Sequence, residues 1–153
     1  MIQLIRSNNE AATINSMYLA LKDQMTGTDN YFLFGAKSQE TGKTKYFVPV
    51  SVTDTNADRY FKAVVWVVRV EVNDTPAAGL IYLGDYTYPY GYYDMTIYEN
   101  NTSSNLDPDN AVKTLSKTVM NLTATNNPAV SYTEYTSNDS ANDVVYITNT
   151  LEA

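Results

Sequence analysis

Short runs in which apolar and polar residues alternate make up most of the chain. Alternation with a period of two residues places successive side chains on opposite faces of the backbone, which is the pattern of a half-buried β-strand. Clusters of Gly, Pro, Asn and Asp separate these runs and mark turns. The pattern therefore predicts one all-β domain over residues 1–153, built as a sandwich of about eight or nine short strands.

Several runs predict strands directly. In chain order they are residues 1–5, 31–38, 45–52, 59–72, 80–83, 130–135 and 144–148. The sequence Glu40-Thr41-Gly42-Lys43 provides a turn that joins the second and third of these runs as a hairpin. Residues 100–110 are a loop by composition, and residues 111–122 fit a helical turn that leads into a strand.

Residues 8–25 fit two different patterns. A helical stripe is formed by Ile14, Met17, Tyr18, Leu21 and Met25, with Asn8 or Asn9 available as the N-cap. Strand alternation fits Met17, Leu19 and Leu21 equally well. Asparagine and threonine in this segment weaken a helix, so we favour the strand.

The longest run, residues 59–72, is apolar on both faces. One face carries Tyr60, Val64, Trp66, Val68 and Val70, and the other carries Phe61, Ala63, Val65 and Val67. A strand with apolar side chains on both faces is expected to be covered on both sides. We therefore predict that Trp66 is buried and that Trp66→Ala destabilises the fold by about 3–5 kcal/mol.

Seven tyrosines lie between residues 82 and 98, at positions 82, 86, 88, 90, 92, 93 and 98. Pro89 and Gly91 interrupt this stretch, because proline cannot donate to a central ladder and glycine often marks a bulge. After the break we expect a strand in which Tyr93, Met95 and Ile97 face the core and the polar residues between them face solvent.

Ten basic and seventeen acidic residues give a net charge of −7, and no segment gathers Lys and Arg. Nucleic acid binding, which needs clustered cations, is therefore not expected. The chain has no cysteine and no histidine, which excludes disulfides, thiolate metal sites and a serine–histidine triad. Neither a signal peptide nor a membrane span is expected, because no apolar run is long enough for either.

The acidic residues offer two candidate sites. Residues 54–58, DTNAD, copy the start of a calcium loop, but Arg59 and Val65 stand where that loop requires Gly and Glu. The carboxylates available for glycoside hydrolysis are Asp85, Asp94, Glu99, Asp107 and Asp109. They lie among polar residues that give no reason for a raised pKa, and Ser103 and Ser104 have no histidine partner. We therefore expect no enzymatic activity, no metal site and no cofactor.

The tyrosines are the best candidates for a binding surface. An aromatic ring with a polar tip offers a large, rigid contact to a protein, a sugar or a base. We assign Tyr31, Tyr60 and Tyr93 to core and strand packing. Four of the other tyrosines of the stretch are expected to be exposed and to bind a partner, as tyrosine does at interfaces; they are Tyr86, Tyr88, Tyr90 and Tyr92.

Several short motifs follow one another in a fixed order. They are YFLF at residues 31–34, ETGKTKYF at 40–47, GYY at 91–93, IYE at 97–99, SSNLDP at 103–108 and VVYI at 144–147. In this order the chain resembles small virion proteins of tailed phages that infect Bacteroidota and marine bacteria, including the crAss-like phages. The similarity covers roughly residues 13–148, with two departures: an inserted DYTYPYG and a more apolar VVWVVRVEV.

The resemblance implies an immunoglobulin-like antiparallel β-sandwich without catalytic residues. It also implies an auxiliary or decoration protein of the capsid exterior, made in the host cytoplasm, that binds the major capsid protein or another virion protein and stabilises the shell. A homo-oligomer is a further expectation. Two alternatives stay open: a carbohydrate-binding module on a fibre that uses the tyrosines, and a neck or tail connector built on the same sandwich.

Overall fold

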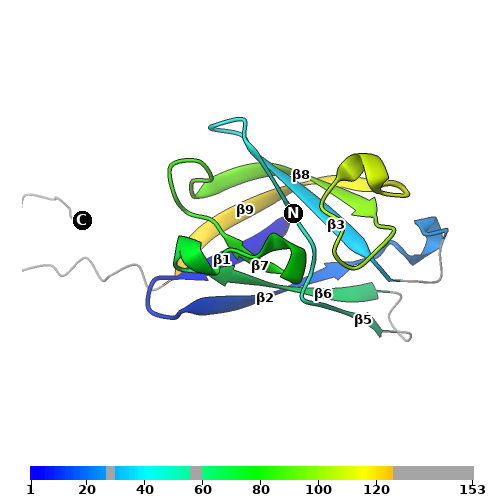
Figure 1. The fold of residues 1–153 in the computed structure, drawn as a ribbon, viewed down its shortest axis with the longest axis horizontal. Coiled ribbons are helices and arrows are strands. Elements are labelled where there is room, and N and C mark those ends of the chain that lie inside the picture. Colours follow the sequence, from blue (N-terminus) through cyan, green and yellow to red (C-terminus); the bar gives the residue numbers. More distant parts are fainter. Residues whose placement is uncertain (27–29, 56–59, 126–153) are drawn as a thin grey trace, which may run out of the picture.

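The computed structural model describes residues 1–26, 30–55 and 60–125, in which the chain forms nine β-strands and four short 3₁₀ turns (Figure 1). The strands are β1 (Ile2–Ser7), β2 (Ala12–Leu19), β3 (Phe32–Ser38), β4 (Thr44–Phe47), β5 (Ser51–Thr55), β6 (Tyr60–Val68), β7 (Leu80–Tyr82), β8 (Gly91–Glu99) and β9 (Lys113–Thr125). The turns are η1 (Lys22–Gln24), η2 (Glu71–Asn73), η3 (Pro76–Ala78) and η4 (Pro108–Asn110).

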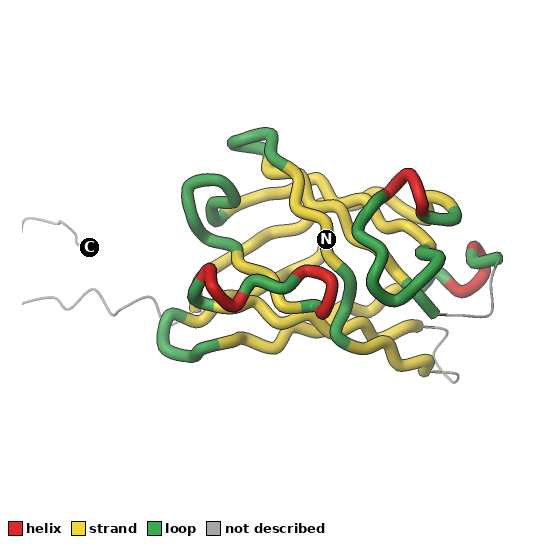
Figure 2. The backbone as a smooth tube through the Cα atoms, viewed as in Figure 1, coloured by secondary structure: helices red, strands yellow, loops and turns green. Residues whose placement is uncertain are grey.

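Two β-sheets pack face to face (Figure 2). The five-stranded sheet has the order β1-β9-β8-β3-β4. The four-stranded sheet has the order β2-β6-β5, and β7 also pairs with β6. The prediction of an all-β sandwich is confirmed.

The strand order is that of an immunoglobulin variable-type domain, in which strands B, E and D form one sheet and strands G, F, C and C′ belong to the other. Here β2, β6 and β5 correspond to strands B, E and D. Strands β9, β8, β3 and β4 correspond to G, F, C and C′. Two pairs are parallel, β1 with β9 and β6 with β7, so both sheets are mixed where the prediction named antiparallel pairing. Both pairs join strands separated by long connections, which permit parallel pairing where a hairpin does not.

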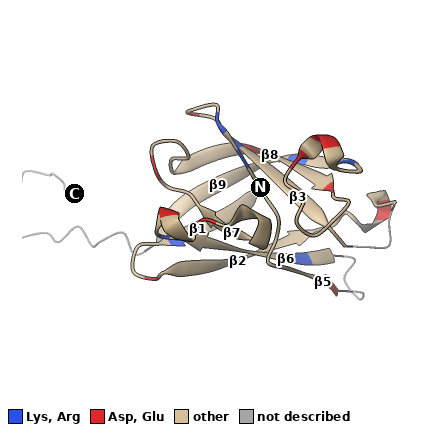
Figure 3. Ribbon diagram, viewed as in Figure 1, with Lys and Arg blue, Asp and Glu red and all other residues tan. Residues whose placement is uncertain are grey.

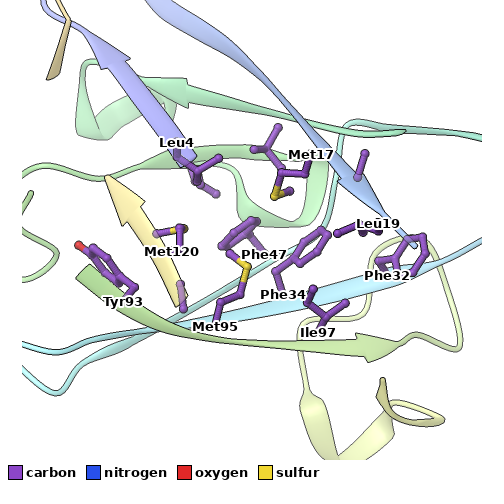
Figure 4. Packing of buried hydrophobic residues seen from close by; sticks show 14 of the residues in the cluster. Leu4, Met17, Leu19, Phe32, Phe34, Phe47, Tyr93, Met95, Ile97 and Met120 are labelled. Atoms are coloured by element: carbon purple, nitrogen blue, oxygen red, sulfur yellow. The ribbon is translucent and has the colours of Figure 1, made fainter. Parts of the chain in front are cut away.

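The core between the sheets is almost entirely apolar (Figure 4). Its buried side chains come from both sheets and include Leu4, Met17, Leu19, Phe32, Phe34, Phe47, Tyr93, Met95, Ile97 and Met120. The phenylalanine rings contact one another, with centroids 5.3 Å apart for Phe32 and Phe61. Burial of Tyr93, Met95 and Ile97 confirms the face that the sequence predicted for β8.

Several further predictions can be compared with the strands. Of the two alternatives for residues 8–25, the strand is correct, as β2 shows. The predicted loop at residues 100–110 leads through η4 into β9, which extends to Thr125. The predicted strands at residues 130–135 and 144–148 lie outside the described residues.

Residues 45–52, predicted as one strand, form parts of two strands in different sheets. β4 ends at Phe47 in the five-stranded sheet, and β5 begins at Ser51 in the four-stranded sheet. Continuing the β3–β4 register would set Pro49 opposite Phe32. Proline has no N–H group with which to continue a ladder, so pairing stops there and the chain crosses to the other sheet.

The strand predicted at residues 59–72 is covered mainly on one face, with Val68 as the one buried residue of the outer face. Its inward residues, Phe61, Ala63, Val65 and Val67, are buried. Trp66 is 36% exposed and Tyr60 is 44% exposed, so the prediction that these two side chains are buried is wrong. A two-layer sandwich gives each sheet a single covered face, and these rings lie on the outer one. The cost of Trp66→Ala should therefore fall below the range for a buried tryptophan.

One buried asparagine closes the seam between β1 and β2. Asn15 Oδ1 accepts a hydrogen bond from the Ile5 N–H at 2.8 Å, and Asn15 Nδ2 donates to the Ile5 carbonyl at 2.9 Å. Two residues further along β1, the Ser7 N–H donates to the Thr13 hydroxyl oxygen at 2.7 Å. Side chains thus satisfy main-chain groups that a neighbouring strand would otherwise pair.

We expect Asn15→Leu to lower the free energy of unfolding by about 1–3 kcal/mol, because it leaves the N–H and C=O groups of Ile5 without partners. Urea unfolding measures the change. Gln3→Leu is the matched control, since it removes an amide whose hydrogen bond to Thr123 is exposed, and it should change stability by less than about 0.5 kcal/mol. Equal stability of the two variants would show that the amide of Asn15 does not close the seam.

Candidate binding surface

Residues 83–90 connect β7 to β8, and we call residues 84–92, which include the first two residues of β8, the tyrosine loop. Gly84 begins the loop with φ 96° and Gly91 lies near its end with φ 130°, values that favour glycine. The N–H groups of Gly84 and Asp85 donate to the Tyr88 carbonyl at 2.6 and 3.2 Å. In return, the Tyr88 N–H donates to Asp85 Oδ1 at 2.8 Å. These bonds close the first half of the loop into a compact turn.

Tyr93 fixes the C-terminal end of the loop. Its fully buried side chain donates from the hydroxyl to the Pro89 carbonyl at 2.6 Å. A tyrosine near the start of strand F that bonds to the main chain a few residues upstream is the tyrosine corner of immunoglobulin-like sandwiches, and β8 occupies that place. Burial, with a smaller contribution from Asp85, raises the pKa of Tyr93 far above its usual value, so the hydroxyl remains a donor.

Tyr88 packs inward and fastens the middle of the loop. Its half-buried ring lies against the core, and its hydroxyl donates to the Thr44 carbonyl at 3.2 Å. The Lys45 ammonium lies 5.2 Å from the ring centre, within the range of a cation–π contact. Burial, followed by the charges of Asp85 and Asp74, raises the pKa of Tyr88. The expectation that Tyr88 is exposed is therefore wrong, and the residue is an anchor of the loop.

Arg6 of β1 holds the N-terminal end of the loop. Its Nη1 donates to the carbonyls of Leu83 at 2.7 Å and Gly84 at 3.3 Å. Its Nη2 donates to the Arg69 carbonyl at 3.1 Å. The guanidinium also lies 5.4 Å from the ring centre of Tyr82. One side chain thus ties both ends of the connection between β6 and the tyrosine loop to the five-stranded sheet.

Three tyrosines of the loop face solvent. Tyr86 is fully exposed, Tyr92 is 53% exposed and Tyr90 is 36% exposed. Tyr90 and Tyr92 flank Gly91, and all three border one shallow hollow, while Tyr90 and Gly91 also border a second. The first hollow is completed by Ser38, Gln39 and Glu40, and the second by residues 121–124. Tyr86 borders a separate hollow beside η2. The structure therefore brings together two of the four predicted contact tyrosines.

A second group of exposed apolar residues lies on the outer face of the four-stranded sheet. Its members are Ile14, Tyr18, Tyr60 and Trp66, which are between 36% and 65% exposed. Ile14 lies directly opposite Trp66 in the β2–β6 register. The sequence interpretation missed this group, although Ser16 and Lys62 share the same face of their strands and could have marked it as the outer one.

Two of the acidic residues that were considered for glycoside hydrolysis make structural contacts. Asp107 caps η4 by accepting from the Asp109 N–H at 3.0 Å. Glu99 is 2% exposed and accepts from the N–H of Thr26 at 3.0 Å and from its hydroxyl at 3.2 Å. Among the described residues no three His, Cys, Asp or Glu side chains gather to hold a metal. Most of the candidate calcium segment, residues 56–58, lies outside those ranges.

No known protein family, curated protein or solved structure matches the chain. In the part of the chain that the structure describes, no helix has the length and apolar character needed to cross a membrane. What the geometry provides is a fixed loop with solvent-facing aromatic rings, which is suited to binding by surface contact.

Proposed function

We propose that the protein is a non-enzymatic structural protein of a phage particle, an auxiliary protein that binds the outside of the capsid shell and stabilises it. The observation that carries the binding role is the exposed pair Tyr90 and Tyr92 on a loop fixed from beneath. The virion setting rests on the order of sequence motifs. The partner that this setting implies is the major capsid protein or another virion protein.

The fixed backbone of the tyrosine loop supports a binding role. Ordering a mobile loop at an interface reduces affinity, and a loop held in place before binding avoids that cost. Tyr93, Tyr88 and Arg6 hold this loop from three directions. Tyrosine rings add large contact area with few rotatable bonds. The exposed rings can therefore contribute to affinity with a small loss of entropy.

The distribution of charge indicates what class of partner the loop suits. Figure 3 shows the charged residues spread over several strands and loops instead of gathered on one face. The net charge of the chain is −7, which disfavours a nucleic acid partner. Asp85 is the only charged residue in the tyrosine loop. Contact through this loop therefore relies on aromatic area and hydrogen bonds, which favours a protein surface.

The double substitution of Tyr90 and Tyr92 by alanine should weaken attachment to the particle by at least about 2 kcal/mol, which is roughly thirtyfold in the dissociation constant. Neither ring is part of the buried core, so the domain should remain folded by circular dichroism. Binding of the purified chain to particles that lack it, and to isolated major capsid protein, measures the effect.

Tyr60→Ala is the control, because it removes an exposed tyrosine from the other sheet. It should bind as the wild type does. A folded double variant that occupies particles as fully as the wild type would refute the assignment of this surface. If a map of the virion shows Tyr90 and Tyr92 free and an oligosaccharide binds them, the fibre carbohydrate-binding module replaces the proposal. Density at the neck or tail would favour the connector.

A further inference from the structure

Strand β2 leaves one long edge of the four-stranded sheet without a paired strand among the described residues, since β1 is joined to β2 only through the side chains of Asn15 and Thr13. On its other side β2 pairs with β6 along its whole length. It is eight residues long, whereas β5 at the opposite edge has five. The strand is drawn in blue in the lower part of Figure 1. An edge of this length is a template on which a further strand can pair.

The direction of the main-chain groups along β2 follows from one hydrogen bond. The Arg69 N–H donates to the Ala11 carbonyl at 3.0 Å, so the main chain of residue 11 faces β6. In an antiparallel ladder successive residues face alternate sides. Odd-numbered residues of β2 therefore bond to β6. The residues whose N–H and C=O groups face the free edge are Ala12, Ile14, Ser16 and Tyr18.

β2 lacks the features by which edge strands avoid pairing. Natural edges are short, or carry a charge, a proline or a bulge. Among the other edge strands, β1 contains Arg6, β4 contains Lys45 and β5 contains Asp54, while β7 has only three residues. The sequence of β2, ATINSMYL, has no charge, proline or glycine, and its ladder with β6 has no register shift. Its outward side chains Ile14 and Tyr18 are both about two-thirds exposed.

We propose that two copies of the chain join through this edge, with their β2 strands antiparallel about a two-fold axis at Ser16. In this register Ile14 of each copy faces Tyr18 of the other. A β-branched residue opposite an aromatic one is a favourable cross-strand pair. All of these pairs are of the hydrogen-bonded type, because even-numbered residues face the edge in both copies. The edge is therefore complementary to itself.

The distribution of charge supports a second copy as the occupant. A chain with a net charge of −7 resists self-association wherever its acids would meet. β2 carries no charge, as Figure 3 shows by its uniform tan colour. No acidic residue lies between Glu10 and Asp23 in the sequence. The paired edge therefore contains no carboxylate that would repel its counterpart in the second copy.

This inference goes beyond the proposed function and does not depend on it, because self-association is measured on the isolated full chain. Analytical ultracentrifugation from roughly 1 μM to 1 mM covers the range of weak complexes. We expect the wild type to shift from the monomer mass to the dimer mass. Ser16→Lys sets two ammonium groups face to face at the axis and should raise the dissociation constant at least about tenfold.

Ser51→Lys is the matched control, since it adds the same charge at an exposed position of β5, the opposite edge of the sheet. It should dimerise as the wild type does. Hydrogen exchange then identifies the edge: the amides of Ile14, Ser16 and Tyr18 should gain protection with concentration, while those of their odd-numbered neighbours are protected throughout.

The proposal is overturned by a monomer mass at every concentration, or by a Ser16→Lys variant that dimerises as tightly as the wild type. Dimerisation that leaves the exchange of the edge amides unchanged would place the contact on another surface. Edge amides protected in the monomer at every concentration would assign the edge to another segment of the same chain, and would also overturn the proposal.

Discussion

Tyr93→Ala is expected to lower the free energy of unfolding by about 3–5 kcal/mol, the range for truncating a large buried aromatic side chain. Tyr93 is fully buried between the sheets, and its hydroxyl donates to the Pro89 carbonyl. Alanine removes the ring contacts and leaves that carbonyl without its donor. Denaturant unfolding followed by circular dichroism measures the loss, and faster hydrogen exchange in the tyrosine loop should accompany it.

Tyr93→Phe removes the hydroxyl and keeps the ring, so it measures the contribution of the hydroxyl alone. It should lower the free energy of unfolding by about 1 kcal/mol at neutral pH. It also tests the raised pKa of Tyr93. Above pH ~10 the unfolded chain releases this proton while the folded chain retains it, so the wild type should lose stability as the pH rises beyond that point. The phenylalanine variant should lose less. Equal alkaline loss in both proteins would mean that the buried hydroxyl does not set this dependence.

Gly79→Ala is expected to cost about 2–4 kcal/mol, because two penalties add. The first is backbone strain, since Gly79 has φ 85°. The second is a collision, since a Cβ atom at this position would lie 2.3 Å from the Val50 main-chain nitrogen. The neighbour is backbone, at the crossing from β4 to β5, and it cannot move aside as a side chain can. Thermal and urea unfolding measure the change.

Gly42→Ala isolates the strain from the collision. Gly42 has a similar φ of 74°, but a Cβ atom there would meet nothing within 4 Å. This variant should cost only about 1 kcal/mol, the penalty of the left-handed conformation alone. If the two alanine variants prove equally stable, the close approach of Gly79 to Val50 does not constrain the fold.

Local patterns predicted most strands because the residues that end a strand act locally. Pro89 and Gly91 interrupt the tyrosine stretch whatever surrounds them, and β8 begins at Gly91. Pairing partners depend instead on contacts between distant residues. β1 pairs with β9, more than one hundred residues away, and no local signal encodes that choice. For this reason the two parallel pairs could not be predicted from the alternation.

The exposure of individual aromatic rings was the least predictable feature of the candidate site. Tyr88 and Tyr90 have the same parity, yet one packs against the core and the other faces solvent, because a loop has no fixed period. Trp66 stands among valines, and its exposure depends on whether a third layer covers the sheet. The sequence did contain one signal that Trp66 lies on the outer face, because the charged residue Lys62 lies on the same face of β6.

The anchoring of the tyrosine loop divides two tasks among chemically identical residues. Tyr88 and Tyr93 hold the main chain, whereas Tyr86, Tyr90 and Tyr92 extend from it. We therefore expect the scaffold to tolerate substitution at the three outward positions, most readily at the fully exposed Tyr86. A randomised library at these positions, displayed on an otherwise unchanged domain, should yield binders for targets unrelated to the original partner.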